Sequence, residues 1–263
     1  MGNTDLVART VESVAARAQW FLLTEDVPER RGFMQATTPT VKLLGVLVLV
    51  ALTVTQRALP TVAALATLSG VLAFLSRVPA GTFLGRLGGP PVVAMLVVSP
   101  QAVLMGGPRL SGLPLSAAGV EYVLLFAVRV AACVGFLSVL LLTTRFSDIL
   151  GALSRLRAPS IAVSLLSITY RYLLLFFAEL ERMVRARRGR TLAETSLART
   201  WRDSGNFLGA FLLRSVERGE RVQRAARARG GTGTAQTQRT ESAGAVDLVF
   251  GMVVLTAVVV VWL

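Results

Sequence analysis

The stretch that decides the fold is VEYVLLFAVRVAACVGFLSVLLLT, residues 120–143, in which apolar side chains follow one another with few interruptions. Similar runs occupy residues 41–54 and 245–263. Hydrophobic residues make up 53% of the 263-residue chain, and several runs approach the roughly 20 residues that a helix needs to cross a bilayer. The sequence therefore predicts an all-α protein, a multi-pass bundle of membrane helices.

About five spans are expected. They are placed at residues 41–56, 59–76, 91–106, 118–143 and 246–263. The third is short because Pro90-Pro91 and Gly106-Gly107-Pro108 bound it, which favours a tilted or buried helix. Five crossings and one large cytoplasmic helical insert form the expected architecture.

Positive charge is distributed unevenly along the chain. Of the net charge of +13, residues 180–230 carry a large share, with 13 arginines against five acidic residues. Short loops rich in arginine stay on the cytoplasmic side, and Arg30, Arg31 and Lys42 flank the first span. We therefore expect the N-terminus and residues 144–230 to be cytoplasmic.

The apolar stretch 161–178 has arginine-rich sequence at both ends, so we expect a helix in the membrane interface or beneath the bundle. A helical hairpin should follow, broken near Ser204-Gly205-Asn206. The expected division is an N-terminal segment, a four-span bundle, a coupling-helix domain, a flexible linker and a last span, at residues 1–40, 41–143, 144–230, 231–245 and 246–263.

Two copies of one arginine pattern lie 39 residues apart. They read ERMVRARRGRT at 181–191 and ERVQRAARARG at 220–230, and six of eleven positions agree. Residues at i, i+4 and i+8 share one stripe of a helix, so each copy should present a small alanine between two guanidinium groups. Such a stripe suits acidic groups or backbone carbonyls on a partner. The stripe residues are Arg182, Ala186 and Arg190 in the first copy, and Arg221, Ala225 and Arg229 in the second.

The residues of an enzyme site are absent from the sequence. The chain has no histidine, its only cysteine is Cys133, and no P-loop pattern occurs, so neither catalysis nor a cofactor or metal site is expected. Glu121 either lines a polar path or lies at the outer membrane surface. Asp148 is expected to begin a helix, with Ser147 or Thr144 as its N-cap.

Four stretches resemble the transmembrane (T) components of energy-coupling factor (ECF) transporters, and among them the cobalt-transport CbiQ type. The resemblance covers roughly residues 38–263. Thr38 and Thr40 stand where that family usually has Asp and Arg. The stretches are Pro39-x-x-Lys42-Leu43; Thr144-x-x-x-Asp148-Ile-Leu-x-Ala-Leu followed by Pro159; Tyr170-Arg171-Tyr172 with Glu179, Glu181 and Met183; and the signature at 217–230.

The resemblance implies two short X-Arg-X motifs that dock into grooves on two ATP-binding cassette ATPase subunits. Residue by residue these are Gly189-Arg190-Thr191 and Ala228-Arg229-Gly230. An alternative register for the first is Ala186-Arg187-Arg188. The stripe residues named above would support the motifs.

The implied role is mechanical coupling between the ATPases and a substrate-binding (S) component in the bilayer. The family type implies cobalt ion as cargo, with nickel or a vitamin as alternatives, and nucleic acid is not an expected partner. A different class remains open from the residues alone, namely a membrane-anchored arginine-rich module that binds lipid or nucleic acid. A permease carrying its own substrate would need polar spans, and these spans have few polar residues.

Overall fold

The computed structural model describes four stretches of the chain, and these consist of α-helices and turns without a β-strand. The all-helical fold class predicted from hydropathy is confirmed. The described stretches are residues 32–106, 116–188, 197–230 and 244–262.

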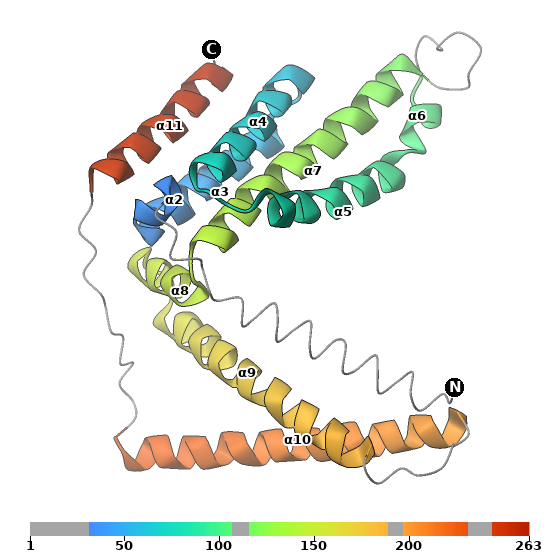
Figure 1. The fold of residues 1–263 in the computed structure, drawn as a ribbon, viewed down its shortest axis with the longest axis vertical. Coiled ribbons are helices and arrows are strands. Elements are labelled where there is room, and N and C mark those ends of the chain that lie inside the picture. The colour runs from blue at the N-terminus through green and yellow to red at the C-terminus, as the bar shows by residue number, and fades with distance from the viewer. Residues whose placement is uncertain (1–31, 107–115, 189–196, 231–243, 263) are drawn as a thin grey trace. The chain divides into compact units, whose positions relative to one another are not determined.

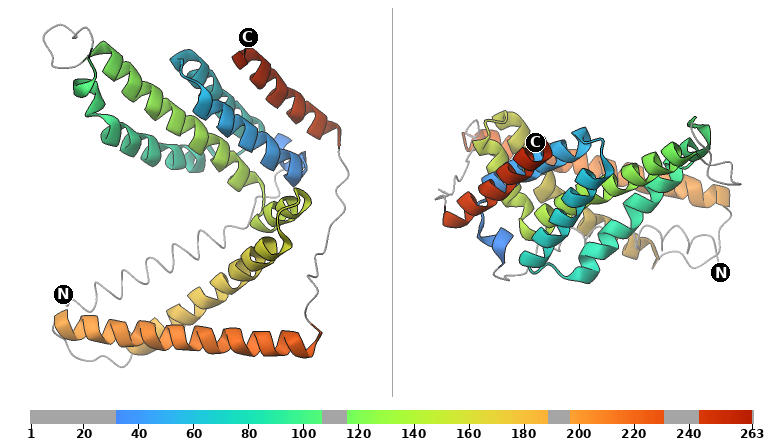
Figure 2. Two further views of the ribbon diagram at one scale, coloured as in Figure 1. Left: turned by 180° about the vertical axis from the view of Figure 1, so that it is seen from behind. Right: turned by 90° about the horizontal axis from the view of Figure 1, so that it is seen from above.

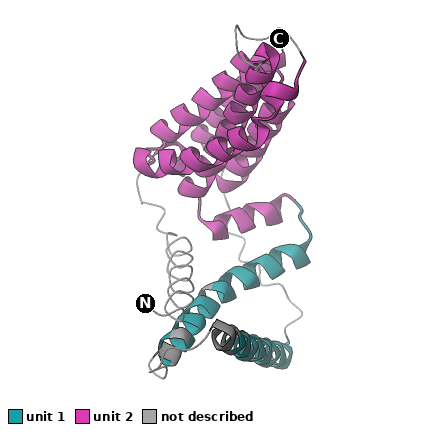
Figure 3. Cartoon of the chain, turned by 90° about the vertical axis from the view of Figure 1, so that its right-hand side faces the viewer, with its two compact units in different colours: residues 1–26, 157–238 teal, residues 27–156, 239–263 magenta. Residues whose placement is uncertain are grey.

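The chain divides into two compact units (Figure 3). We call residues 27–156 with 239–263 the bundle unit, and residues 157–238 with 1–26 the hairpin unit. The last helix of the sequence thus belongs to the same unit as the first apolar helices.

The bundle unit contains eight of the described helices. Two of them, α3 and α4, carry a proline in their first turn, where the missing N–H would have had no helical partner. Helix α7 begins with Ser116, whose hydroxyl accepts from the amide of Gly119 at 2.9 Å. The helices are α2 (Phe33–Ala36), α3 (Pro39–Thr55), α4 (Leu59–Leu75), α5 (Ala80–Val98), α6 (Gln101–Leu104), α7 (Ala117–Thr143), α8 (Phe146–Arg155) and α11 (Ala245–Trp262).

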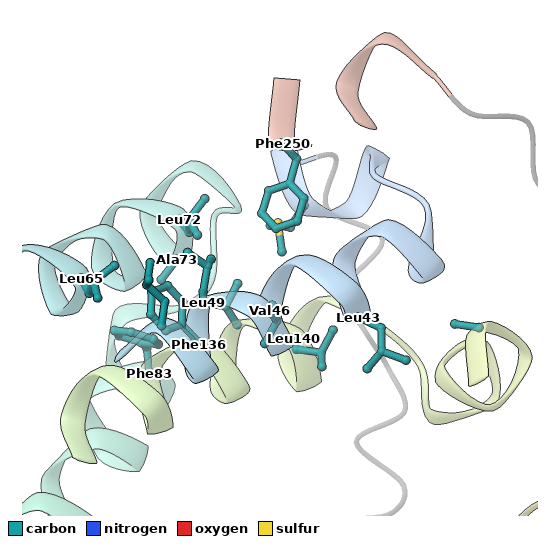
Figure 4. Close-up of a cluster of buried hydrophobic side chains, with 14 residues drawn as sticks. Leu43, Val46, Leu49, Leu65, Leu72, Ala73, Phe83, Phe136, Leu140 and Phe250 are labelled. Atoms are coloured by element: carbon teal, nitrogen blue, oxygen red, sulfur yellow. The ribbon is translucent and has the colours of Figure 1, made fainter. Parts of the chain in front are cut away.

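Helix α7 is the centre of the bundle unit and packs against α3, α4 and α5 (Figure 1). Its Phe136 is fully buried. The surrounding cluster takes side chains from the neighbouring helices, among them Leu49 of α3, Leu72 of α4, Phe83 of α5 and Phe250 of α11 (Figure 4). The apolar run that decides the fold therefore supplies the core as well.

Small residues let two helix pairs approach closely. A methyl group added to Gly135 of α7 would overlap the Ser69 hydroxyl of α4 and lie 3.0 Å from its Cβ. A methyl group on Gly45 of α3 would overlap the ring of Phe250 in α11. Close backbone approach at small residues is typical of helix packing in membranes.

The first turn of α3 is a polar joint tied to the end of α7 and to α8. Lys42 is buried, and its Nζ donates to the Thr143 carbonyl and to the Thr144 hydroxyl, both at 3.3 Å. Arg155 of α8 donates to the Thr40 hydroxyl at 3.4 Å. Lys42 is expected from the sequence to be a charge that flanks the first span. In the structure it is buried, and its hydrogen bonds connect α3 to the end of α7.

Asp247 of α11 is the carboxylate of this joint. One of its oxygens accepts from the Thr38 amide at 2.7 Å and from the Thr38 hydroxyl at 3.2 Å, and the other accepts from the Gly244 amide at 2.8 Å. Asp247 is only 5% exposed, so these bonds replace its contacts with water. Asp247, late in the sequence, thus provides the hydrogen-bond acceptor for the Thr38 amide at the start of α3.

Arg129 lies inside α7 and also joins two helices. Its guanidinium donates through Nη2 to the carbonyl of Gln56, the residue that ends α3. Its Nε is buried and has no hydrogen-bond partner among the described residues. The terminal carbonyl of α3 is therefore satisfied by a side chain from the middle of another helix.

The outer faces of the bundle unit are apolar. Leu96 of α5 and Leu248 of α11 are more than 70% exposed. Within the described residues of both units, four helical stretches are long and apolar enough to cross a membrane: Ala80–Leu104, Ala117–Thr143, Ser160–Met183 and Ala245–Trp262. Helices α3 and α4 are apolar but have only 17 residues each, about 26 Å at 1.5 Å per residue. These features are those of a membrane protein.

Two local predictions for this unit are wrong. The sequence predicts a helix over residues 91–106. In the structure helix α5 begins at Ala80 and continues through Pro90 and Pro91. Prolines are tolerated inside membrane helices, because neighbouring groups satisfy the freed carbonyls. Helix α8 has Arg145 at its N-cap with no side-chain cap bond, so neither Ser147 nor Thr144 caps it, although Asp148 does lie in its first turn.

Candidate coupling hairpin

Two long helices form the described part of the hairpin unit (Figure 2). Helix α9 (Ser160–Arg188) has 29 residues and α10 (Leu197–Ala228) has 32. At 1.5 Å per residue they measure about 44 and 48 Å. Helix α9 starts directly after Pro159, whose carbonyl accepts from the Val163 amide at 3.2 Å.

Helix α10 continues through Ser204-Gly205-Asn206, so the break predicted there is wrong. One glycine costs a helix only about 1 kcal/mol relative to alanine, too little to interrupt a helix of this length. Helix α9 likewise joins residues 161–178 to the first arginine copy without interruption. The connection between the helices falls at residues 189–196, outside the described residues. The interfacial position of 161–178 stays a prediction.

The two helices meet through aromatic rings. Phe176 of α9 contacts Phe211 of α10 edge to face, with ring centroids 6.0 Å apart and an interplanar angle of 79°. Tyr172, one turn earlier on α9, lies 6.2 Å from the ring of Phe176. An edge-to-face arrangement is one that aromatic pairs prefer, and this apolar contact precedes the arginine copy on each helix.

Glu179 lies one turn beyond Phe176, and its carboxylate lies close to several arginines. Its carboxylate pairs with Arg182 of its own helix at 2.8 Å. It also faces two arginines of α10, Arg214 at 3.6 Å and Arg218 at 3.9 Å. One carboxylate thus holds three guanidinium groups from two helices.

The two arginine copies share an internal ion pair. Glu181 pairs with Arg185 in the first copy, and Glu220 pairs with Arg224 at 3.7 Å in the second. Both pairs are i, i+4 with the glutamate on the N-terminal side, the orientation that stabilises a helix. The matching glutamates therefore have a physical role that arginine richness alone would not require.

The four described stripe residues lie on exposed helix faces. Arg182 and Ala186 are exposed on α9, and Arg221 and Ala225 are exposed on α10. Arg221 also approaches Glu217 of its own helix at 4.0 Å. Because each arginine precedes its alanine by four residues, the two pairs form the expected stripes.

Helix α10 ends at the second arginine motif. Ala228 is its last residue, the amide of Arg229 bonds back to the carbonyls of Ala225 and Ala226, and Arg229 is exposed. Gly230 has φ +74°, and its amide donates to the Arg227 carbonyl at 3.1 Å. This is the glycine that terminates many helices in the left-handed conformation. The Ala-Arg-Gly order therefore places an arginine at the tip of a helix.

The first motif, Gly189-Arg190-Thr191, lies outside the described residues. Helix α9 ends at Arg188, directly before it. The choice between this register and Ala186-Arg187-Arg188 stays open, since Arg190 remains a sequence assignment.

Gly230→Ala is expected to fray the last turn of α10. An L-residue costs roughly 1–2 kcal/mol in the left-handed region, whereas asparagine adopts it more readily. Amide hydrogen exchange of residues 226–229 should rise in Gly230→Ala and rise less in Gly230→Asn. Equal exchange in all three proteins would show that the glycine does not hold this end.

No metal or cofactor site is evident in this part of the protein. Among the described residues, no three acidic, cysteine or histidine side chains cluster as metal ligands would. The described part of the hairpin offers ion pairs, exposed guanidinium groups and a glycine-terminated helix end.

Sequence reasoning did not assign roles to Glu179, Arg129 or Asp247. A single charge inside or beside an apolar run was the available signal in each case. Their partners lie on other helices, 209 residues away for Asp247, so spacing alone could not identify them.

Comparison with known proteins agrees with this description. The family model described as CbiQ, cobalt transport protein, matches residues 32–240. An uncharacterized protein of Methanocaldococcus jannaschii is 22% identical over an alignment that covers 99% of this chain and 93% of that protein. The family match includes the described helices from α2 to α10, with both arginine copies. This chain belongs to the CbiQ cobalt transport protein family.

Proposed function

We propose that this chain is the transmembrane coupling subunit of an ECF-type importer. It binds two ATP-binding cassette ATPase subunits and passes their movement to a substrate-binding S component in the bilayer. Cobalt ion is the proposed cargo. The chain itself performs no catalysis; the ATPases supply the energy.

The observation that carries this proposal is the pattern shared by the two arginine copies of the hairpin unit. Each copy has the same glutamate–arginine pair, followed by an exposed alanine. The second copy ends in an exposed Arg229 at a glycine-terminated helix end. Two similar patterns on one chain suit two similar binding grooves, one on each ATPase.

In this proposal the N-terminus and residues 144–230 lie on the cytoplasmic side, where ATP is available, with the apolar stretch 161–178 in the membrane interface or beneath the bundle. The arginine content of residues 180–230 supports that side, because arginine-rich loops are retained there. The apolar outer faces of the bundle unit are then left for lipid and for the S component.

The test is co-purification of the tagged chain from its native membrane in mild detergent, with partners identified by mass spectrometry. The Arg190→Ala/Arg229→Ala double variant is purified in parallel. We expect ATPase subunits and a small membrane protein with the parental chain, and loss of the ATPases from the double variant. The identity of the small partner also separates cobalt from nickel or a vitamin as cargo.

A parental chain that arrives without any ATPase would refute the proposal. A double variant that retains its ATPases would refute the assignment of the two motifs. Salt-sensitive capture of anionic lipid that weakens equally with any lost arginine would instead support a lipid-binding module.

A further inference from the structure

The two arginine copies are related by a shift of 39 residues, and each lies on one helix of the hairpin unit. Glu179 and Arg218 are equivalent positions under that shift, as are Arg190 and Arg229. Glu179 precedes Arg190 by eleven residues, and Arg218 precedes Arg229 by eleven. The contact between Glu179 and Arg218 therefore joins corresponding points of the two arms.

Ion pairs as well as an aromatic contact join the two helices at this crossing. The ring contact of Phe176 with Phe211 lies beside an open surface pocket of about 320 Å³, which Glu179, Arg214 and Arg218 line. Where this open space separates the helices, close packing does not fix the angle between α9 and α10. The ion pairs of Glu179 reach across it from one helix to the other.

Resting on the proposed function, we propose that Glu179 is the positioning residue that sets the angle between α9 and α10. Arg214 and Arg218 lie four residues apart on one face of α10, so a single carboxylate can hold both. Its third partner, Arg182, lies one turn further along α9 in the direction of the first motif. Glu179 thus connects Arg182, a stripe arginine of the first copy, to the crossing point.

The angle can be measured without any partner protein. Spin labels are attached to the full chain, with Cys133→Ser removing its only cysteine. One label at Arg171 of α9 is paired in turn with Asn206 and with Gln223 of α10, which lie on either side of the crossing and are exposed. Pulsed electron paramagnetic resonance gives both distance distributions.

Glu179→Gln should broaden both distributions, because it removes the charge and keeps the shape. Glu179→Asp should preserve them in large part. Glu179→Arg combined with Arg214→Glu and Arg218→Glu should restore them, since both cross-helix pairs are rebuilt with their charges exchanged. The matched control is Glu220→Gln, which breaks an ion pair confined to α10 and should leave both distances as in the parental chain.

The coupling readout uses the whole complex and radioactive cobalt ion as the probe. Glu179→Gln should still co-purify the ATPases, while cobalt uptake per ATP hydrolysed falls about fivefold or more, as expected for a loss of coupling between sites. The charge exchange should recover it.

Unchanged distances in Glu179→Gln would overturn the inference. So would changed distances with normal uptake per ATP, because the angle would then not serve coupling. If the parental chain binds no ATPase, the proposed function fails and the coupling role fails with it. The spin-label distances still decide whether Glu179 sets the angle, so the two failures are distinguishable.

Discussion

Arg229→Ala is expected to reduce transport to background while the chain still accumulates in the membrane. The side chain is exposed at the end of α10, so its removal leaves no cavity in the bundle unit. An arginine that anchors an interface contributes roughly 2–4 kcal/mol, which weakens binding of one ATPase by about 30- to 1,000-fold. The measurement is uptake of labelled cobalt ion by cells that express the complex.

Two variants decide what the side chain contributes. Arg229→Lys keeps the charge but loses the planar fork, so we expect intermediate transport. Arg227→Ala removes the same charge two residues earlier, from an exposed position in the last turn of α10, and should retain most of the transport. If Arg227→Ala and Arg229→Ala lose transport equally, general charge rather than a motif explains the hairpin.

Gly135→Leu is expected to prevent stable assembly of the bundle unit. The new side chain would start against Ser69 of α4, at a place where even a methyl group overlaps the hydroxyl. Overpacking a core typically costs 1–3 kcal/mol and more when backbones must separate, against a total stability of about 5–15 kcal/mol. Thermal unfolding of the chain purified in detergent measures the loss.

The same site allows a rescue and a control. Gly135→Ala should be milder, and adding Ser69→Ala should recover part of its loss, because the overlapping hydroxyl is gone. Gly251→Leu on α11 is the matched control, since nothing lies within 4 Å of a Cβ there. Gly135→Leu as stable as Gly251→Leu would show that α4 and α7 do not need this close approach.

The long elements could be predicted from the sequence because each depends on a local pattern. Continuous apolar runs gave α3, α4, α7 and α11 to within a few residues. The second arginine motif was also predictable, since a terminal glycine after a helical stripe is a local signal. The family resemblance rested on short motifs instead, such as Pro39-x-x-Lys42-Leu43 and the signature at 217–230.

The failures share a physical cause. Pro90-Pro91 and Ser204-Gly205-Asn206 are local signals for a break, but both helices continue through them. The burial of Lys42 depends on Thr143 and Thr144, which lie about a hundred residues further along. In each case something beyond the local signal decides the outcome: the length of the helix at Gly205, neighbouring groups at Pro90-Pro91, and distant residues at Lys42.

The tie between Asp247 and Thr38 has a consequence for biosynthesis. The two residues are 209 positions apart, so a ribosome adding about 5–20 residues per second needs roughly 10–40 s to pass from one to the other. Until then the Thr38 amide lacks its carboxylate and the surface beside Gly45 lacks the ring of Phe250. Both arginine-bearing helices are therefore translated before α11 can pack against α3. During that interval the newly inserted protein must remain intact while α3 lacks its contacts with α11.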